Sequence, residues 1–200
     1  MPIDFRKTRF LGVAADLKQC PAPIHPEVVL SGRSNVGKSS LVNTLADNRT
    51  LARTSNTPGK TRLIIYFSID DRILLTDLPG YGFAKVSREI KAGFSALADT
   101  YLTSGRPVAL VLHLLDIRHD PSRDDLQMIK FLHSSRIPYQ VVLTKADKLS
   151  RLQAVQRCEQ IAAALDLESS AELLVFSATA KTGVDELRQC IAAVLQDTGM

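Results

Sequence analysis

The sequence predicts an α/β fold of three layers, in which a mostly parallel six-stranded sheet with one antiparallel strand carries helices on both faces. Short apolar runs alternate with segments of helical spacing along the chain, apart from one hairpin, and this alternation is typical of a parallel sheet. The run Val108–Leu115 is almost continuously apolar, as strands covered on both faces are. Because 200 residues suffice for one domain and are short for two, we expect residues 1–200 to form a single domain.

Composition favours an ordinary globular protein, with 45% hydrophobic and 23% charged residues. No apolar run approaches the roughly 20 residues of a membrane span, and the charged N-terminus lacks the apolar core of a signal peptide. We therefore expect a cytoplasmic protein without a membrane partner. Three widely spaced cysteines, without a Cys-x-x-Cys pair, predict buried or idle thiols. A net charge of +4 permits RNA as a partner and equally fits a solvated surface.

Residues 1–26 predict an N-terminal arm. Arg9–Val13 has the composition of a short strand or an extended arm, and Pro21, Pro23 and Pro26 stiffen the approach to the apolar run Val28–Leu30. That run predicts the first buried strand of the sheet.

A phosphate-binding loop follows this strand and leads into a helix expected over about Lys38–Ala46. Its residues fit G-x-x-x-x-G-K-[ST]: Gly32, Arg33, Ser34, Asn35, Val36, Gly37, Lys38 and Ser39. The glycines allow backbone angles that turn successive N–H groups inward, and the helix start adds its positive dipole end. Lys38 supplies a charge for the β- and γ-phosphates, and the Ser39 hydroxyl is a hard ligand for Mg²⁺. The alternative is a chance glycine-rich turn, which the strand and helix on its flanks oppose.

A long polar loop, Leu51–Thr61, follows this helix and has a length common among functional loops. Thr61 and Thr57 are both candidates for a second Mg²⁺ hydroxyl, and the residues alone do not choose between them. Two strands, Leu63–Phe67 and Ile73–Thr76, then form a hairpin across Asp70-Asp71.

The segment Asp77-Leu78-Pro79-Gly80 closes the second hairpin strand, at the sheet edge where open α/β sheets bind ligands. A carboxylate here can hold Mg²⁺ through water, and the Gly80 amide can meet a γ-phosphate. A plain turn is the alternative, which the preceding phosphate-binding loop disfavours.

The remaining elements alternate. Helices are expected over about Ser87–Leu102, Pro121–His133, Leu152–Leu165 and Val184–Leu195, and strands over Val108–Leu115, Tyr139–Thr144 and Leu173–Phe176. We expect the core positions of the second of these helices to be Leu126, Ile129, Phe131 and Leu132. His113, inside an apolar strand, is expected to be a packed core histidine.

Thr144-Lys145-Ala146-Asp147 follows a strand and predicts a guanine site. A carboxylate accepts both donors of the guanine edge, whereas adenine would leave its oxygens unpaired. The Lys145 stem can pack along the base, and Ser177-Ala178 after the last strand can bring the Ala178 amide to the guanine carbonyl. The alternative is a helix N-cap aspartate beside a surface lysine.

These motifs together resemble the EngB (YsxC/YihA) family of bacterial GTP-binding proteins, which has the Ras-like phosphate-loop NTPase fold. The stretches that carry the resemblance are Gly32–Ser39, Thr57–Thr61, Asp77–Lys85, Asp116–His119 with Asp124-Asp125, and Thr144–Asp147. Position by position, the resemblance implies that Gly32–Ser39 holds phosphates and that Ser39, Thr61 and Asp77 serve Mg²⁺. It implies a first switch of Gly59, Lys60, Thr61, Arg62 and Leu63, and a second of Asp77, Leu78, Pro79 and Gly80. It gives the guanine site to Thr144, Lys145, Ala146 and Asp147 with Phe176, Ser177 and Ala178.

The resemblance implies a cytoplasmic GTPase that acts in assembly of the large (50S) ribosomal subunit and in normal cell division and septation. Its ligands would be GTP and GDP with Mg²⁺, its partner the subunit precursor with its rRNA and ribosomal proteins, and nothing demands more than a monomer. Two departures affect the first switch: Arg62 stands where the family has Gln, and Ile65-Tyr66-Phe67 lacks an Asn.

The residues also predict slow hydrolysis. Many GTPases place a water-orienting Gln directly after the glycine of Asp-x-x-Gly, and this chain has Tyr81. Catalysis is then limited to positioning and charge stabilisation by Lys38, Thr61 and the Gly80 amide with Mg²⁺. Asn35 is either a K⁺ ligand, as in related GTPases with Asn at this position, or a structural loop residue. A phosphate-loop ATPase or small-molecule kinase is the alternative function, which the guanine motifs disfavour.

Overall fold

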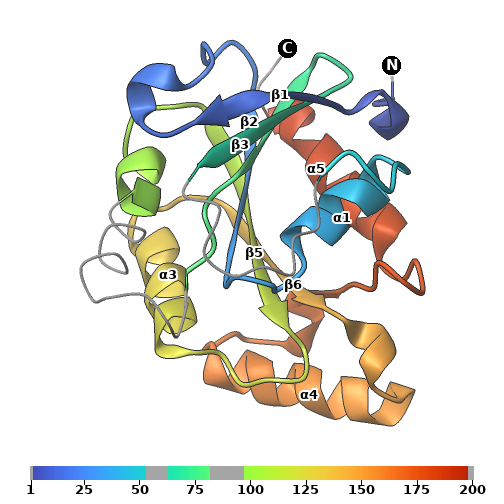
Figure 1. The fold of residues 1–200 in the computed structure, drawn as a ribbon. Coiled ribbons are helices and arrows are strands. Elements are labelled where there is room, and N and C mark those ends of the chain that lie inside the picture. Colours follow the sequence, from blue (N-terminus) through green and yellow to red (C-terminus); the bar gives the residue numbers. More distant parts are fainter. Residues whose placement is uncertain (1, 53–62, 82–96, 198–200) are drawn as a thin grey trace.

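The computed structural model describes residues 2–52, 63–81 and 97–197, which form one seven-stranded sheet flanked by helices (Figure 1). The strand order is β1-β3-β4-β2-β5-β6-β7. The strands are β1 (Arg9–Ala14), β2 (Glu27–Gly32), β3 (Ile64–Ile69), β4 (Ile73–Asp77), β5 (Val108–Asp116), β6 (Tyr139–Thr144) and β7 (Leu173–Val175). The helices are α1 (Lys38–Leu45), α3 (Arg123–Ser134), α4 (Arg151–Ala164) and α5 (Val184–Asp197). Residues 97–102 are also helical.

The sheet confirms the predicted class. β3 is antiparallel to both of its neighbours, and all other pairs are parallel. The expected number of six strands is wrong, because the N-terminal arm joins the sheet as β1, with Phe10 opposite Phe67 and Val13 opposite Ile65. For Arg9–Val13, the sequence allowed either a short strand or an extended arm. β1 lies at the sheet edge and is mostly exposed, so it carries little of the burial pattern that identifies a strand.

Helices cover both faces of the sheet. α1 and α5 pack on one face through a core that includes Leu41, Leu187, Val28 and Leu112. The helical residues 97–102 with α3, and α4 beside them, pack on the other face (Figure 1). Residues 53–62, which include most of the expected loop Leu51–Thr61, lie outside the described residues. So do residues 82–96, which include most of the helix expected over Ser87–Leu102.

The buried stripe of α3 differs from the expected one. Leu126 is 41% exposed, so its assignment to the core was wrong. The buried positions are Asp125, Met128, Ile129 and Leu132, which have the spacing of one helix face. The phase is set at the first turn, where Ser122 and Asp125 form a capping box that turns the aspartate inward.

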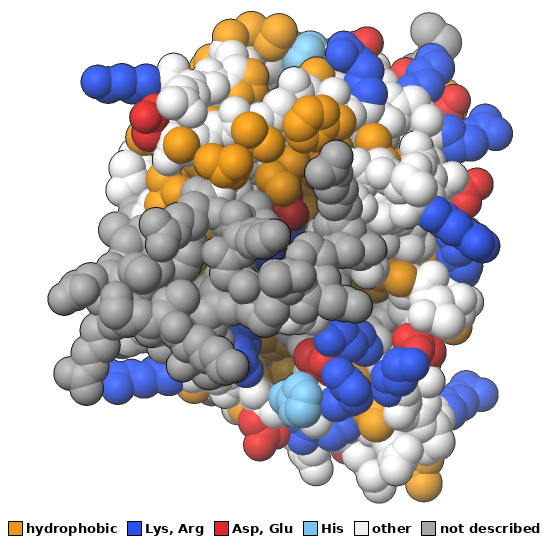
Figure 2. All heavy atoms as spheres, viewed as in Figure 1, with side chains coloured by type: hydrophobic (Ala, Val, Ile, Leu, Met, Phe, Trp, Pro, Cys, Tyr) orange, Lys and Arg blue, Asp and Glu red, His pale blue; other side chains and the backbone are white. Residues whose placement is uncertain are grey.

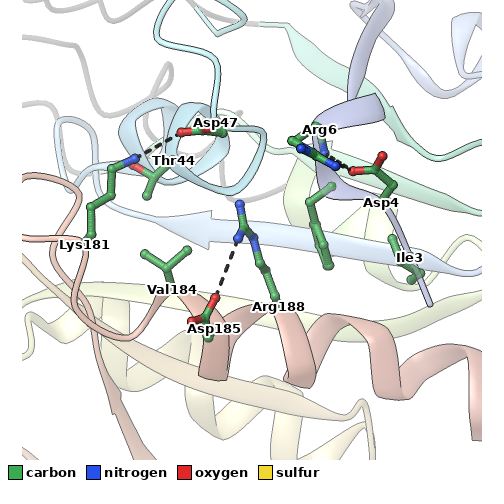
Figure 3. A pocket seen from close by; sticks show the side chains of 10 residues that line it. Ile3, Asp4, Arg6, Thr44, Asp47, Lys181, Val184, Asp185 and Arg188 are labelled. Carbon is green, nitrogen blue, oxygen red and sulfur yellow. Dashed lines mark hydrogen bonds and ion pairs between the residues drawn. The ribbon is translucent and has the colours of Figure 1, made fainter.

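The N-terminal segment packs across the end of α1 that is remote from the phosphate-binding loop. Phe5 enters the core, and the Arg188 guanidinium lies 5.6 Å from its ring centroid. A cavity of about 540 Å³ remains between this segment, the C-terminal end of α1 and the start of α5 (Figure 3). Acidic and basic side chains both line it, with Lys181 paired to Asp47 and Arg188 to Asp185. This cavity contains none of the predicted nucleotide-binding residues.

The β1 edge of the sheet presents apolar side chains to solvent. Phe10, Leu11 and Val13 are 52%, 41% and 48% exposed, and Ile24 in the following segment is 71% exposed. Figure 2 shows hydrophobic side chains gathered at the top of the molecule, where Figure 1 places β1. Basic side chains in the same view are interspersed with acidic ones. No helix among the described residues is long and apolar enough to cross a membrane.

Candidate nucleotide-binding site

The phosphate-binding loop has the backbone that its sequence predicts. It links the end of β2 to α1, with Gly32 at φ +145° and Gly37 at φ +119°. Asn35 also adopts a left-handed conformation, at φ +62°. Gly37 occupies the N-cap of α1 and has no side chain to cap the first amides of the helix. An anion bound at the start of the helix would accept hydrogen bonds from these N–H groups.

Asp77 brings a buried carboxylate to the same place. β4 and β2 are parallel neighbours, with Asp77 opposite Leu30, so Asp77 ends its strand beside the phosphate-binding loop. Asp77 Oδ1 lies 3.8 Å from Lys38 Nζ, and within the described part of the chain this buried oxygen has no hydrogen-bond partner. Burial raises the pKa of Asp77, and the nearby Lys38 charge opposes that rise. A buried carboxylate oxygen without a donor among the described residues fits a hydrated cation. Ser39, which follows Lys38 in the first turn of α1, is the hydroxyl predicted for the same ion.

Gly80 packs tightly against the phosphate-binding loop. A Cβ atom at Gly80 would lie 2.8 Å from the Ser34 nitrogen and 3.0 Å from Lys38 Nζ, so a side chain has no room here. The next residue, Tyr81, accepts a backbone hydrogen bond of 2.9 Å from the Ser34 N–H. The structure therefore places the second predicted switch in contact with the phosphate-binding loop.

The segment Thr144–Asp147 is fastened to the other side of that loop. Thr144 Oγ1 donates to the carbonyl of Val36 at 2.6 Å. Lys145 adopts φ +61° and donates from Nζ to the carbonyl of Asn35 at 2.8 Å. Lys145 Nζ also lies 3.0 Å from Asp116 Oδ2. These contacts fix the Lys145 ammonium against the phosphate-binding loop, and the packing of its stem along a base stays a prediction.

Asp116 holds the Lys145 ammonium in this position. Although burial acts to raise its pKa, hydrogen bonds from Arg118 and Lys145 outweigh burial and hold the pKa of Asp116 well below its usual range. The carboxylate therefore stays charged and fixes the Lys145 ammonium. Sequence reasoning gave Asp116 no role, because nothing in the sequence shows that its strand ends beside β6.

Asp147 is held by the loop after the last strand. Its Oδ1 accepts a 2.7 Å hydrogen bond from Ser177 Oγ, and Ser177 is fully buried. Hydrogen bonding from Ser177, together with Lys148, lowers the pKa of Asp147, so it remains an acceptor-only carboxylate. The N-cap of α4 is Ser150, which excludes the alternative of Asp147 as that cap.

Segments that carry the guanine prediction meet at this point. The Ala146 N–H donates to the carbonyl of Phe176 at 3.2 Å, which joins Thr144–Asp147 to Phe176–Ala178. The structure thus assembles both guanine segments, the phosphate-binding loop and Asp77–Gly80 at the carboxyl ends of β2, β4, β5, β6 and β7. Of the predicted first switch, Leu63 lies just before β3, whereas Thr57, Gly59, Lys60, Thr61 and Arg62 lie outside the described residues.

One buried polar cluster was not foreseen. His113 is a fully buried core histidine, as predicted, but it lies beside Tyr81 and Asp125 rather than among apolar side chains alone. Two features of the sequence could have indicated this cluster. Asp125 is an acidic residue on the apolar face of a helix, and His113 is a histidine in an apolar strand.

Comparison with known proteins agrees with this geometry. Residues 27–145 match the family described as 50S ribosome-binding GTPases. A probable GTP-binding protein EngB of Syntrophomonas wolfei is 44% identical over 195 residues, which cover 98% of this chain and 100% of that protein. A probable GTP-binding protein EngB of Streptococcus pneumoniae is 41% identical over 186 residues, which cover 93% of this chain and 95% of that protein.

Solved structures give the same fold. A crystal structure of a probable GTP-binding protein EngB superposes with a TM-score of 0.71 at 22% identity and covers 86% of this chain and 99% of that one. Era, solved in complex with MgGDPNP and nucleotides of 16S ribosomal RNA, superposes with a TM-score of 0.65 at 22% identity, covering 84% of this chain and 56% of Era. The relatives, the matched GTPase family and this fold together show that the chain belongs to the EngB family of GTP-binding proteins and is a GTPase.

Proposed function

We propose that this GTPase is a slow molecular switch that acts in the cytoplasm in assembly of the large ribosomal subunit, and that normal cell division and septation depend on it. The observation that carries the proposal is the match of residues 27–145 to 50S ribosome-binding GTPases, on a chain whose nucleotide motifs lie together. The ordering of loops by a γ-phosphate is a general way for such proteins to signal to a partner.

In this proposal, the backbone of Gly32–Ser39 and the Lys38 ammonium hold the phosphates. Asp147 takes the two donors of the guanine edge, and Lys145 lies along the base. Ser39, Thr61 and, through water, Asp77 would hold Mg²⁺, which neutralises phosphate charge when it is bound. The unpartnered Oδ1 of Asp77, buried beside Lys38, supports this assignment.

Slow hydrolysis is part of the proposal because Tyr81 does not replace the missing glutamine. Its side chain is only 7% exposed, and its hydroxyl donates to Asp125 at 2.5 Å. A hydroxyl held there is turned into the protein interior and does not orient a water for attack on the γ-phosphate. Positioning by Lys38, Thr61 and the Gly80 amide then carries the chemistry, and the GTP state persists long enough to be read by a partner.

The proposed partner is the precursor of the large subunit, and the GTP-bound monomer is the form that binds it. A net charge of +4 is compatible with an rRNA contact. The described surface in Figure 2 mixes charges of both signs, so we expect ribosomal proteins to share in the contact.

Co-sedimentation tests this proposal. The protein is mixed with purified 50S or 30S subunits in the presence of a non-hydrolysable GTP analogue or GDP, and Asp147→Asn serves as a variant with weakened guanine binding. We expect binding to 50S with the GTP analogue, weaker binding with GDP and little binding to 30S. Equal binding to both subunits, or to neither with either nucleotide, would overturn the ribosomal assignment without affecting the GTPase assignment.

A further inference from the structure

Three buried side chains from separate parts of the chain meet beside the second switch. Tyr81 follows Gly80, His113 lies in β5 and Asp125 lies in the first turn of α3. Tyr81 Oη donates to Asp125 Oδ1 at 2.5 Å and lies 3.3 Å from His113 Nε2. The Tyr81 and His113 rings are stacked, with 14° between their planes. We call these three residues the tyrosine latch.

The latch is fully partnered within the fold. The other oxygen of Asp125, Oδ2, accepts from the Ser122 N–H at 2.7 Å and from Ser122 Oγ at 2.6 Å. His113 Nδ1 lies 3.4 Å from Ser31 Oγ, at the end of β2. Burial acts to raise the pKa of Asp125, but these hydrogen bonds outweigh it and lower that pKa, so Tyr81 donates to a carboxylate. Charge-assisted hydrogen bonds of this kind are stronger than neutral ones.

The main chain of Tyr81 is tied to the phosphate-binding loop at the same residue. It accepts from the Ser34 N–H and forms an isolated parallel bridge with Arg33. Gly80, one residue earlier, is so close to Ser34 and Lys38 that a Cβ atom would not fit. A shift of the Tyr81 main chain would therefore also shift the Gly80 amide relative to Lys38.

We propose that the tyrosine latch holds the Gly80 amide in place for a γ-phosphate and couples that place to the start of α3, so that Tyr81 is a positioning residue for the GTP state. The proposal rests on the GTPase assignment and is independent of the ribosomal one. GDP lacks the group that Gly80 would meet, so the latch acts on GTP binding and leaves GDP binding unchanged. A merely structural tyrosine would affect both nucleotides alike.

The chain offers a matched control. Tyr101 is also a buried tyrosine whose hydroxyl donates to a buried carboxylate, Glu27 Oε2, at 2.6 Å. Glu27 begins β2, at the end opposite the phosphate-binding loop. Tyr101→Phe therefore removes the same atom and the same kind of hydrogen bond as Tyr81→Phe, away from the nucleotide.

The experiment measures the affinities of wild type, Tyr81→Phe, Asp125→Asn and Tyr101→Phe for a non-hydrolysable GTP analogue and for GDP, with Mg²⁺ present. We expect Tyr81→Phe to weaken GTP-analogue binding at least about fivefold, because a hydrogen bond to a charged group is lost, while GDP affinity changes less than about twofold. Asp125→Asn should shift the ratio in the same direction by less, since its amide oxygen still accepts. Tyr101→Phe should leave the ratio unchanged.

An unchanged ratio in Tyr81→Phe, with normal GDP binding, would overturn the latch and leave the GTPase assignment intact. Equal losses for both nucleotides, or the same shift in Tyr101→Phe, would show general loosening and would also overturn the latch. Failure of the wild type to bind GDP would overturn the guanine-nucleotide assignment itself.

Discussion

The two ends of β2 carry two buried networks that look alike and differ in how their charge is compensated. At the start of the strand, Glu27 is fully buried. Its carboxylate accepts hydrogen bonds from Tyr101 Oη at 2.6 Å and from Arg106 Nε at 2.8 Å. At its other end, beside Gly32, Tyr81 donates to Asp125. In both places a tyrosine hydroxyl satisfies a carboxylate that water does not reach.

The two networks differ in the groups that surround the carboxylate. The Arg106 side chain is 10% exposed, pairs with Glu27, and lies over the Tyr101 ring at 5.5 Å. Asp125 is compensated instead by hydroxyls, a backbone N–H and the His113 ring, whose Nε2 is 3.6 Å from Oδ1. A buried ion pair is costly to break, because removing one partner leaves an uncompensated charge. The remote network therefore stabilises the fold through an ion pair, whereas the network beside the nucleotide holds its carboxylate through several hydrogen bonds.

The strongest way to break this comparison is Arg106→Met, which leaves the Glu27 carboxylate buried without its cation. We expect the free energy of unfolding to fall by about 3–5 kcal/mol, the usual cost of removing one partner of a buried pair. Urea denaturation measures it, with Arg106→Lys as a control that keeps the charge. GDP affinity of the folded variant should be unchanged, and a loss of GDP affinity would show that the remote network is not purely structural.

The corresponding change at the other end is Asp125→Asn, for which we expect a smaller loss of about 1–3 kcal/mol, because the hydrogen-bond donors of Tyr81 and Ser122 remain. The folded-state pKa of Asp125 is lowered from 3.8, so its carboxylate stabilises the fold above that pH and the contribution is lost as pH falls through the lower folded value. The difference between wild type and variant should shrink as pH falls below about 3.8. A difference that grows in acid would contradict the assigned charge state.

Asp77→Asn sharpens the comparison, because Asp77 Oδ1 accepts no hydrogen bond from the described residues and has only the Lys38 ammonium, 3.8 Å away, as compensation. Its raised pKa means that ionisation costs the metal-free fold stability at neutral pH, so the variant should be at least as stable as the wild type in EDTA. Magnesium-dependent GTP hydrolysis should nevertheless fall at least about tenfold, since outer-shell ligands contribute effects of that size. A variant that is less stable and fully active would show that Asp77 is structural.

The smallest expected effect concerns Asn35, whose left-handed backbone and exposed position in the phosphate-binding loop leave its side chain available to a ligand. If it helps to hold K⁺, GTP turnover should be several-fold faster in KCl than in NaCl at equal ionic strength, as expected for an added charge at the phosphates. Asn35→Ala should remove the difference. Equal rates in the two salts would assign Asn35 a structural role.

Local patterns predicted most of this molecule. The strand, glycine loop and helix around Gly32–Ser39 and the runs Val108–Leu115 and Tyr139–Thr144 are dictated by residues close in sequence, and they form as predicted. The edge strand β1 was not predicted as part of the sheet, because its hydrogen bonds come from β3, a distant part of the chain. Most of its side chains are exposed, so its sequence lacks the alternation of apolar and polar residues that marks a strand. Leu126 was misplaced because a capping box, rather than hydrophobicity, sets the phase of α3.

In the candidate site too, local motifs were predictable and contacts between distant segments were not. Short motifs and their place after predicted strands were enough to predict Lys38, Asp77, Gly80 and Asp147 as site residues, because each motif has a separate chemical reason. The contacts of Asp116 with Lys145, of Ser177 with Asp147 and of Tyr81 with Asp125 depend on which strands become neighbours. Such pairings are properties of the sheet order, and no local pattern in the sequence encodes them.

The most direct test of the central claim is the binding of fluorescently labelled GTP, GDP and ATP to the wild type and to Asp147→Asn. The asparagine replaces one acceptor oxygen with an amide that faces the donors of guanine, so guanine binding should weaken by about 10- to 100-fold. The account predicts that the wild type binds GTP and GDP but not ATP, and that the variant loses the guanine preference. ATP binding as tight as GTP binding would contradict the assignment of Thr144–Asp147 and favour an ATPase or kinase instead.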